Sequence, residues 1–233
     1  MNRIMTAVLL LALAPSAYAQ KKPATARKPE AHKAAPAADQ AKAVLQKLEA
    51  WDASLKTLKA DFTQEVDFTE AGLKQSIEGN LSYVKPNLLR IEHVKPARQL
   101  VVTDKDVIWI YKPGDRQAVR TKWDVWRRTQ DRNFSGILDF GDYSALTKRN
   151  SATVEGGKGG APYTVTFTPR SGSPYTLTLT LSATDYFPVA AQLSVDGTVI
   201  KTTLSDVQKN AEVDRGIFSF VPPKGTEILE FKN

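Results

Sequence analysis

The sequence predicts a mainly β protein in which one large, strongly curved antiparallel sheet or barrel is covered by two helical segments. Apolar and polar residues alternate with a period of two over many short segments, as in "YTLTLTLS", and this alternation is typical of strands that bury one face. Short turns separate the segments, and only two stretches have helical spacing. The chain has 233 residues, so the part that folds is short enough for one domain.

The N-terminus predicts an exported protein. Residues 1–19 have a cation at Arg3, an apolar run and a terminal Ala-Tyr-Ala motif, which is the order of a cleaved signal peptide. Residues 20–37 are rich in Ala, Pro and Lys, a composition that predicts a flexible basic leader. The apolar run is too short to span a bilayer, so we expect one exported domain over residues 38–233.

Composition indicates the cellular compartment and argues against nucleic acid as a partner. The chain has no cysteine, so an exported form must be stable without disulfides, which suits the bacterial periplasm. The formal net charge is +7, but most of the excess cations lie in the signal and the leader. The folded part therefore lacks the basic excess of a nucleic-acid-binding domain.

The first predicted element is a helix with Asp39 as its N-cap. Its apolar residues recur at spacings of four and three, at Val44, Leu48, Trp51, Leu55 and Leu58. From Ala60 the period changes to two, which predicts a strand that ends near Phe68.

Further strands are predicted at short intervals along the chain. Two of them have inward sets at Ile77, Gly79, Leu81 and Tyr83, and at Leu89, Ile91 and His93. Prolines 86, 96 and 113 each follow a lysine and mark strand ends, because proline cannot donate to a β ladder. The remaining predicted strands are a hairpin at 99–103 and 107–111, a weaker strand at 117–122, and four strands at 163–167, 175–181, 189–195 and 198–204.

The segment between residues 124 and 149 interrupts the strand pattern. It has helical spacing at Phe134, Ile137 and Leu138, and it lies between predicted strands. We expect it to lie across one face or mouth of the sheet as a lid, beside the N-terminal helix.

Motifs for catalysis and for metal binding are scarce. The two histidines are His32, in the leader, and His93, so we expect neither a histidine-dependent triad nor a multi-histidine metal site. The glycine-rich stretch at 156–160 is predicted to be a turn. Asp139 and Asp142 are candidates for acid–base chemistry, but solvated carboxylates are the simpler interpretation. The sequence therefore favours a non-enzymatic protein that holds no metal and no cofactor.

The inward-facing apolar residues exceed what two modest helices would cover. A curved sheet of this size can enclose an apolar cavity that binds a ligand. An ordinary filled core is the alternative that the pattern leaves open. His93 is expected to point inward, either as a half-buried histidine with its own partners or as a polar contact for a ligand.

Four segments of the chain, taken in order, resemble the LolA family of periplasmic outer-membrane lipoprotein carriers. They are "DFTQEV" (61–66), "EGNLSYVKPNLLRIEHVKP" (78–96), "QLVVTDKDVIWIYKP" (99–113) and "FSFVPPKGTEI" (218–228). The resemblance implies an unclosed, highly curved antiparallel β-barrel, covered by the N-terminal helix and central lid helices over an apolar cavity.

The function implied by the resemblance is transport of lipoproteins between two membranes. The monomeric carrier would bind the acyl chains of its lipoprotein cargo, take the cargo from an ABC-type release complex in the inner membrane, and pass it to a receptor lipoprotein on the outer membrane. Each exposed CH₂ of an acyl chain costs about 0.8 kcal/mol in water, so such chains need shelter in the periplasm. A lipid-binding sensor, or a carrier of a different lipid on the same fold, is the alternative.

The resemblance also implies sites. The predicted lipid-binding cavity is lined by inward residues of three strands, namely Phe62, Val66, Leu81, Tyr83, Leu89, Ile91 and His93. Phe134, Ile137 and Leu138 would belong to the lid. A family arginine that precedes the hairpin proline helps to hold the lid closed, and Lys85 stands at that position here. Lysine offers a point charge rather than a planar fork, so Lys85 is the candidate for the lid latch.

Overall fold

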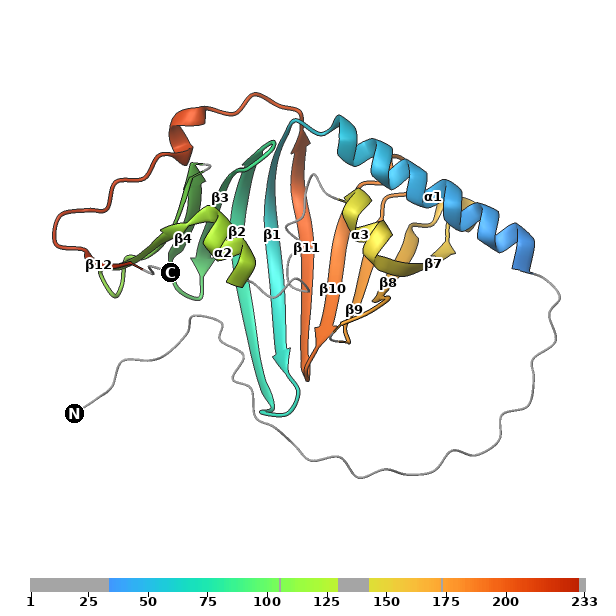
Figure 1. Ribbon diagram of the computed structural model, residues 1–233, viewed down its shortest axis with the longest axis horizontal. Helices are drawn as coiled ribbons and strands as arrows, with labels where there is room; N and C mark the ends of the chain where they lie inside the picture. Colours follow the sequence, from blue (N-terminus) through green and yellow to red (C-terminus); the bar gives the residue numbers. More distant parts are fainter. Residues whose placement is uncertain (1–33, 105, 130–142, 173, 231–233) are drawn as a thin grey trace. The chain divides into compact units, whose positions relative to one another are not determined.

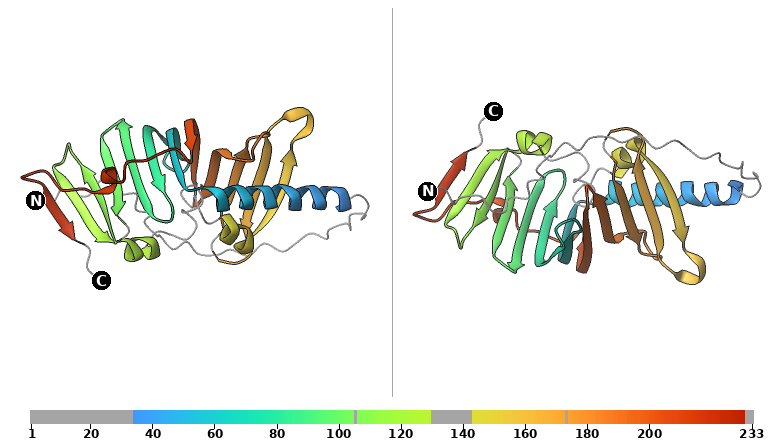
Figure 2. Two further views of the ribbon diagram at one scale, coloured as in Figure 1. Left: turned by 90° about the horizontal axis from the view of Figure 1, so that it is seen from above. Right: turned by 90° about the horizontal axis from the view of Figure 1, so that it is seen from below.

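A computed structural model describes residues 34–104, 106–129, 143–172 and 174–230. These residues form one 12-stranded sheet with the order β12-β6-β5-β4-β3-β2-β1-β11-β10-β9-β8-β7. Its two edges are β12 and β7, so the barrel is unclosed, and the sheet curves with helices on one side (Figures 1 and 2). The predicted fold class, a mainly β protein with an unclosed, curved antiparallel sheet and few helices, is confirmed, and the enclosed apolar cavity stays a prediction.

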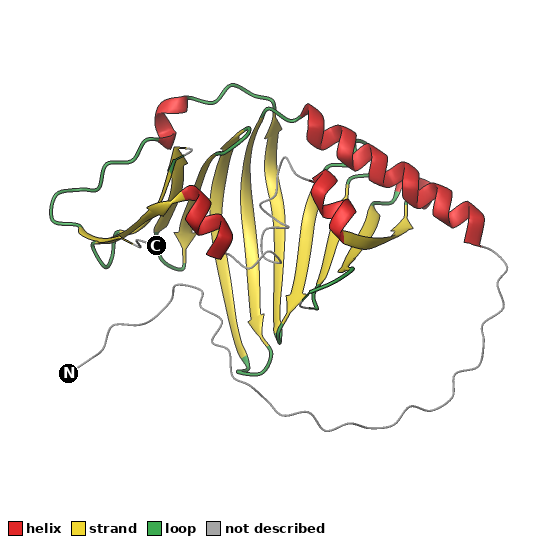
Figure 3. Cartoon of the chain, in the orientation of Figure 1, coloured by secondary structure: helices red, strands yellow, loops and turns green. Residues whose placement is uncertain are grey.

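Strands make up most of the described part of the chain, with one α-helix before the first strand and two short α-helices between β6 and β7 (Figure 3). Two long central strands, β1 and β11, have the two halves of the sheet on either side of them. Neighbouring strands in the described sheet pair antiparallel, apart from β12, which pairs parallel to β6. The bounds are α1 Ala34–Ser54, β1 Thr57–Phe68, β2 Leu73–Val84, β3 Leu88–Lys95, β4 Gln99–Asp104, β5 Val107–Lys112, β6 Gln117–Lys122, α2 Trp123–Thr129, α3 Tyr143–Arg149, β7 Asn150–Gly156, β8 Tyr163–Pro169, β9 Thr176–Leu181, β10 Pro188–Val195, β11 Thr198–Lys209 and β12 Glu227–Glu230.

Helix α1 differs from its prediction at both ends. It begins at Ala34, so Asp39 lies inside the helix and the predicted N-cap is wrong. Alanine is the strongest helix former, and proline is tolerated in a first turn, so "AAPAA" extends the helix into residues that composition assigned to the leader. The helix ends at Ser54, and Leu58 belongs to β1, where it is buried on the same face as Ala60.

The alternating strand pattern is confirmed in the first half of the sheet. Along β1 the buried residues are Leu58, Ala60, Phe62 and Val66, at intervals of two or multiples of two. Gly79 on β2 is required for close packing, because a Cβ there would lie 2.2 Å from the carbonyl oxygen of Glu92 and 2.7 Å from the ring of Phe62. Prolines 86, 96 and 113 lie between strands, as predicted.

The predicted strands of the second half are also present, with longer or shifted ends. Residues 156–160 form the turn between β7 and β8, as expected from their glycines. The sequence pattern missed β7 and β12. β7 is mostly polar, and β12 is exposed along its length and acquires its partner β6 only through the fold.

Three hydrophobic clusters stabilise the molecule. Two lie on the face that α1 covers, and Trp51 of α1 packs against both of them. The third lies on the opposite face, where the segment from Val213 to Phe220 packs on β3, β4 and β5. We call the helix-covered face concave and the opposite face convex.

Candidate functional site

The structure brings the predicted cavity residues together on the concave face. Phe62 and Val66 lie on β1, and the pairs Leu81 with Ile91 and Tyr83 with Leu89 lie side by side across β2 and β3. All six are buried. Val66 belongs to the cluster under α1, while the other five belong to the neighbouring cluster. Their placement on one apolar wall is as predicted, and their contact with lipid stays a prediction.

His93 extends this wall toward the end of β3. Its ring meets the ring of Phe62 edge to face, with 5.8 Å between the ring centroids. Burial lowers the pKa of His93 below the usual 6.5, since a charged imidazole is poorly solvated there. His93 is therefore mainly neutral near pH 7 and adds an aromatic surface to the wall.

Helices α1 and α3 cover the concave face through apolar side chains. Val44 and Leu48 of α1 and Leu146 of α3 are buried in the cluster that also holds Leu177 and Leu193 of the sheet. The contact lacks a backbone ladder of the kind that joins strands, so it depends mainly on apolar burial, and the Thr147 hydroxyl of α3 donates to the Glu49 carboxylate of α1.

Trp51 is the largest side chain between helix and sheet. Its ring meets Phe187 edge to face, with 4.9 Å between centroids, and it lies 6.2 Å from the ring of Tyr143. Trp51 therefore contacts both α3 and the residue that directly precedes β10.

A small set of hydrogen bonds fixes the end of α1. The Lys85 ammonium donates to the backbone carbonyl of Asp52 at 3.1 Å, and the Lys85 N–H donates to the carbonyl of Lys56 at 2.8 Å. The carboxylate of Asp52 accepts from the N–H of Tyr143 at 3.1 Å. Lys85, on the β2–β3 turn, is thus connected through one residue of α1 to the start of α3.

The acceptor is one that a lysine can satisfy, while the role of Lys85 as a lid latch stays a prediction. A single carbonyl oxygen at a helix C-terminus needs a point donor, and a cation there also interacts favourably with the helix dipole. A planar fork is suited to a two-oxygen acceptor. Phe134, Ile137 and Leu138, the predicted lid residues, lie outside the described residues, as do Asp139 and Asp142.

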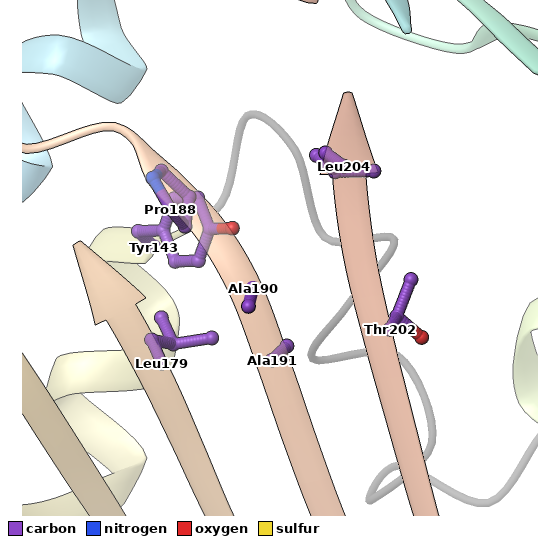
Figure 4. Close-up of a pocket in the computed structure, with 7 residues that line it drawn as sticks. All are labelled: Tyr143, Leu179, Pro188, Ala190, Ala191, Thr202 and Leu204. Atoms are coloured by element: carbon purple, nitrogen blue, oxygen red, sulfur yellow. The ribbon is translucent and has the colours of Figure 1, made fainter. Parts of the chain in front are cut away.

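A shallow hollow, open to solvent, lies between α3 and the concave face (Figure 4). Its free space of about 10 Å³ is about what a single water molecule needs, so it does not hold an acyl chain in this closed state. Alanines on β10 leave this space beneath the ring of Tyr143. The lining residues are Tyr143, Leu179, Pro188, Ala190, Ala191, Thr202 and Leu204.

Sequence reasoning missed three features of this region. Asp52 is only 4% exposed, and the signal was present, since it follows Val44 and Leu48 at intervals of four along the helix. Gln64 and Thr202 form a polar pair within the apolar wall. Arg90 donates to the carbonyl of Ile217 at 2.9 Å and pairs with Glu92, so it joins the sheet to a segment that is distant in sequence.

Other chemistry is not evident in the described part of the chain. Among those residues, no group of three or more His, Cys, Asp and Glu side chains is arranged to hold a metal ion. Within the same residues, no helix has the length and apolar character needed to cross a membrane.

Comparisons with known proteins agree with the geometry. The profile of a family described as "Outer membrane lipoprotein carrier protein LolA" matches residues 53–221. An outer-membrane lipoprotein carrier protein of Chromobacterium violaceum is 30% identical over 202 residues, which is 84% of this chain and 90% of the relative. One of Neisseria meningitidis serogroup B is 25% identical over 175 residues, covering 74% and 80%.

A solved structure supports the fold alone. An uncharacterized conserved protein of Thermus thermophilus has a TM-score of 0.51 at 13% sequence identity, and the match covers 82% of this chain and 99% of that one.

Proposed function

This chain belongs to the LolA family of outer membrane lipoprotein carrier proteins, and we propose that it shelters the acyl chains of a lipoprotein against its concave face. The family is one of transport proteins. Periplasmic carriage of lipoproteins requires an apolar surface that can be closed against water and opened again. The wall supplies the apolar surface, and its helical cover opens and closes it.

The observation that carries the proposal is the contrast between the wall and its cover. The wall presents buried apolar side chains from neighbouring strands, including Leu81, Leu89 and Ile91. The cover rests on it through side chains, with Lys85 and Asp52 supplying directional bonds at one end. Sheltering an acyl chain is worth about 0.8 kcal/mol for each CH₂ removed from water, and this gain offsets the loss of the contacts that the helices give up.

Opening is part of the proposed cycle. The hollow between α3 and the wall has free space of only about 10 Å³, so an acyl chain needs α1 and α3 to move away from the sheet. The helices cover the wall in the closed state and the acyl chain covers it in the open state, so the apolar side chains of the wall are kept from water in both. Cargo is then released when the helices return.

The proposed partners follow from the family. The cargo is a lipoprotein, and the donor and acceptor are an ABC-type release complex of the inner membrane and a receptor lipoprotein of the outer membrane. The proposed location is the periplasm, in agreement with the signal-like N-terminus.

Dye binding by the purified protein tests the wall. Wild type is expected to bind an environment-sensitive apolar dye and to release it on addition of a diacylated lipopeptide. Leu89→Glu puts a charge on the wall, and we expect loss of dye and lipopeptide binding, because burial of an unpaired carboxylate is unfavourable. Val221→Glu, at a position that is 82% exposed and directly follows the convex segment, makes the same change away from the wall and is the control.

Two results would contradict the proposal. One is a folded wild type that binds neither dye nor lipopeptide, and the other is equal lipopeptide binding by both variants. Circular dichroism establishes that each variant is folded. Depletion in cells then distinguishes a carrier from a lipid sensor, since loss of a carrier leaves lipoproteins in the inner membrane.

A further inference from the structure

One polar pair interrupts the apolar wall at its centre. Gln64 of β1 and Thr202 of β11 are directly opposite each other in the antiparallel ladder, and the Gln64 amide Nε2 donates to the Thr202 hydroxyl at 3.0 Å. Both belong to a row of inward residues that crosses the sheet through Ile77, Ala191 and Leu179. Apart from this pair, the side chains of the row are apolar.

The pair uses only part of the carboxamide. A glutamine amide has two N–H donors and a carbonyl acceptor. Within the described part of the chain, the bond to Thr202 is the one hydrogen bond that Gln64 makes through its side chain. Gln64 is half-buried, so its second N–H is accessible to a ligand. The bond to Thr202 fixes the orientation of the amide.

A wall that only shelters hydrocarbon has no need of this pair. Polar groups in an apolar surface are unfavourable unless they are hydrogen-bonded, and a pair of apolar residues would pack there at least as well. Thr202 also lines the hollow beneath Tyr143. Among the described residues, the second N–H of Gln64 therefore lies beside a break in the apolar packing of the wall, which a ligand reaches when the helical cover moves away.

We propose that Gln64, held in place by Thr202, is a polar subsite that donates its second N–H to the ester or amide carbonyl at the head of an acyl chain. Such carbonyls accept hydrogen bonds through their oxygen, so they match a free N–H. The inference rests on the proposed carrier function and adds to it a fixed point that sets how far an acyl chain enters. An alkyl chain without a carbonyl meets the same wall but lacks this contact.

The test compares two lipids that differ in the carbonyl groups. Dioctanoylglycerol and the corresponding dioctyl diether have the same chain length, and each is used to displace a bound apolar dye. One neutral hydrogen bond corresponds to about a three- to tenfold difference in affinity, so wild type is expected to bind the ester more tightly by about that factor. Gln64→Leu should bind both lipids equally and should retain dye binding.

Controls keep the inference separate from the carrier function. Gln192→Leu makes the same change on β10, at a position opposite Lys201 and Thr178 rather than in the inward row, and should keep the ester preference. Gln64→Met supplies a second variant without donors if Gln64→Leu fails to fold.

The results of this lipid comparison distinguish failure of the subsite from failure of the carrier function. Wild type that binds ester and ether equally, or a Gln64 variant that keeps the ester preference, overturns the subsite while leaving the carrier function standing. Wild type that binds neither lipid nor dye instead overturns the carrier function. An ester preference that is lost in Gln64→Leu and kept in Gln192→Leu supports the subsite.

Discussion

The two faces of the sheet are covered in different ways. On the concave face, α1 and α3 rest on apolar side chains, with Lys85 and Asp52 fixing one end. On the convex face, the C-terminal segment is fastened at several points along its length. It is bonded to Arg90 through Ile217, packs Phe220 on Trp109, and ends as β12 in a backbone ladder with β6.

Under the proposed function, the difference separates a cover that moves during the transport cycle from one that stays in place. A β ladder and charge-assisted bonds are directional and must break together, whereas apolar contact can be exchanged for contact with an acyl chain. We therefore expect substitutions on the concave side to change ligand binding, and substitutions on the convex side to change stability alone.

Asp52→Ala should give the largest effect and is the strongest test of the concave side. It leaves the N–H of Tyr143 without its acceptor, and loss of a buried bond to a charged group costs about 2–3 kcal/mol. We expect a lower free energy of unfolding in urea and increased access of an apolar dye to the wall. Asp39→Ala changes an exposed residue of the same helix and should change neither quantity, so equal behaviour of the two variants would contradict the latch.

Phe220→Ala tests the convex side. Its ring lies 5.7 Å from Trp109 and 5.3 Å from Tyr111, measured between centroids. Since Phe220 is half-buried, truncation should lower the free energy of unfolding by about 1–2 kcal/mol, less than for a full core position. The affinity for lipopeptide at a temperature where the protein is folded should be unchanged. A loss of affinity would show that the convex cover is not independent of the site.

Lys85→Met removes the ammonium but keeps the length of the side chain. Loss of its bond to the Asp52 carbonyl should cost about 1 kcal/mol and should raise the rate of dye entry, measured by stopped-flow fluorescence. Lys85→Arg retains a donor for one carbonyl oxygen and should restore the wild-type rate. If Lys85→Met behaves as wild type, Lys85 does not hold the cover.

His93 gives the smallest expected effect, confined to acid pH. Its pKa is lowered in the folded protein, so the unfolded chain binds more protons below pH 6.5, and stability falls as the pH decreases from 6.5 toward the folded pKa. His93→Phe should flatten the urea midpoint over this window, while His32→Phe should leave it unchanged. A pH dependence that survives in His93→Phe would assign it to other groups.

The sequence predicted the parts of the fold that depend on local periodicity. Alternation from Ala60 to Phe68 and from Leu177 to Leu181 was sufficient to place inward residues, because a strand's side-chain period fixes which residues share a face. The resemblance added the open barrel and pointed to Lys85.

Features that depend on distant partners could not be read from local pattern. β12 pairs with β6 only after the C-terminal segment has crossed the convex face. Asp52 is a charge within an apolar helical stripe, and its acceptor role needs Tyr143, which is far away in sequence. The pair of Gln64 and Thr202 likewise depends on the register between β1 and β11.

Photo-crosslinking in cells tests the central claim most directly. A photoreactive phenylalanine analogue is placed at Ile91, which faces the concave side, or at Glu92, whose partner Arg90 contacts the convex C-terminal segment. We predict crosslinks to lipoproteins from position 91 and none from position 92, with the crosslinks lost when cargo acylation is blocked. Equal crosslinking from both positions, or crosslinking that persists without acyl chains, would contradict the claim that the concave face carries the lipid.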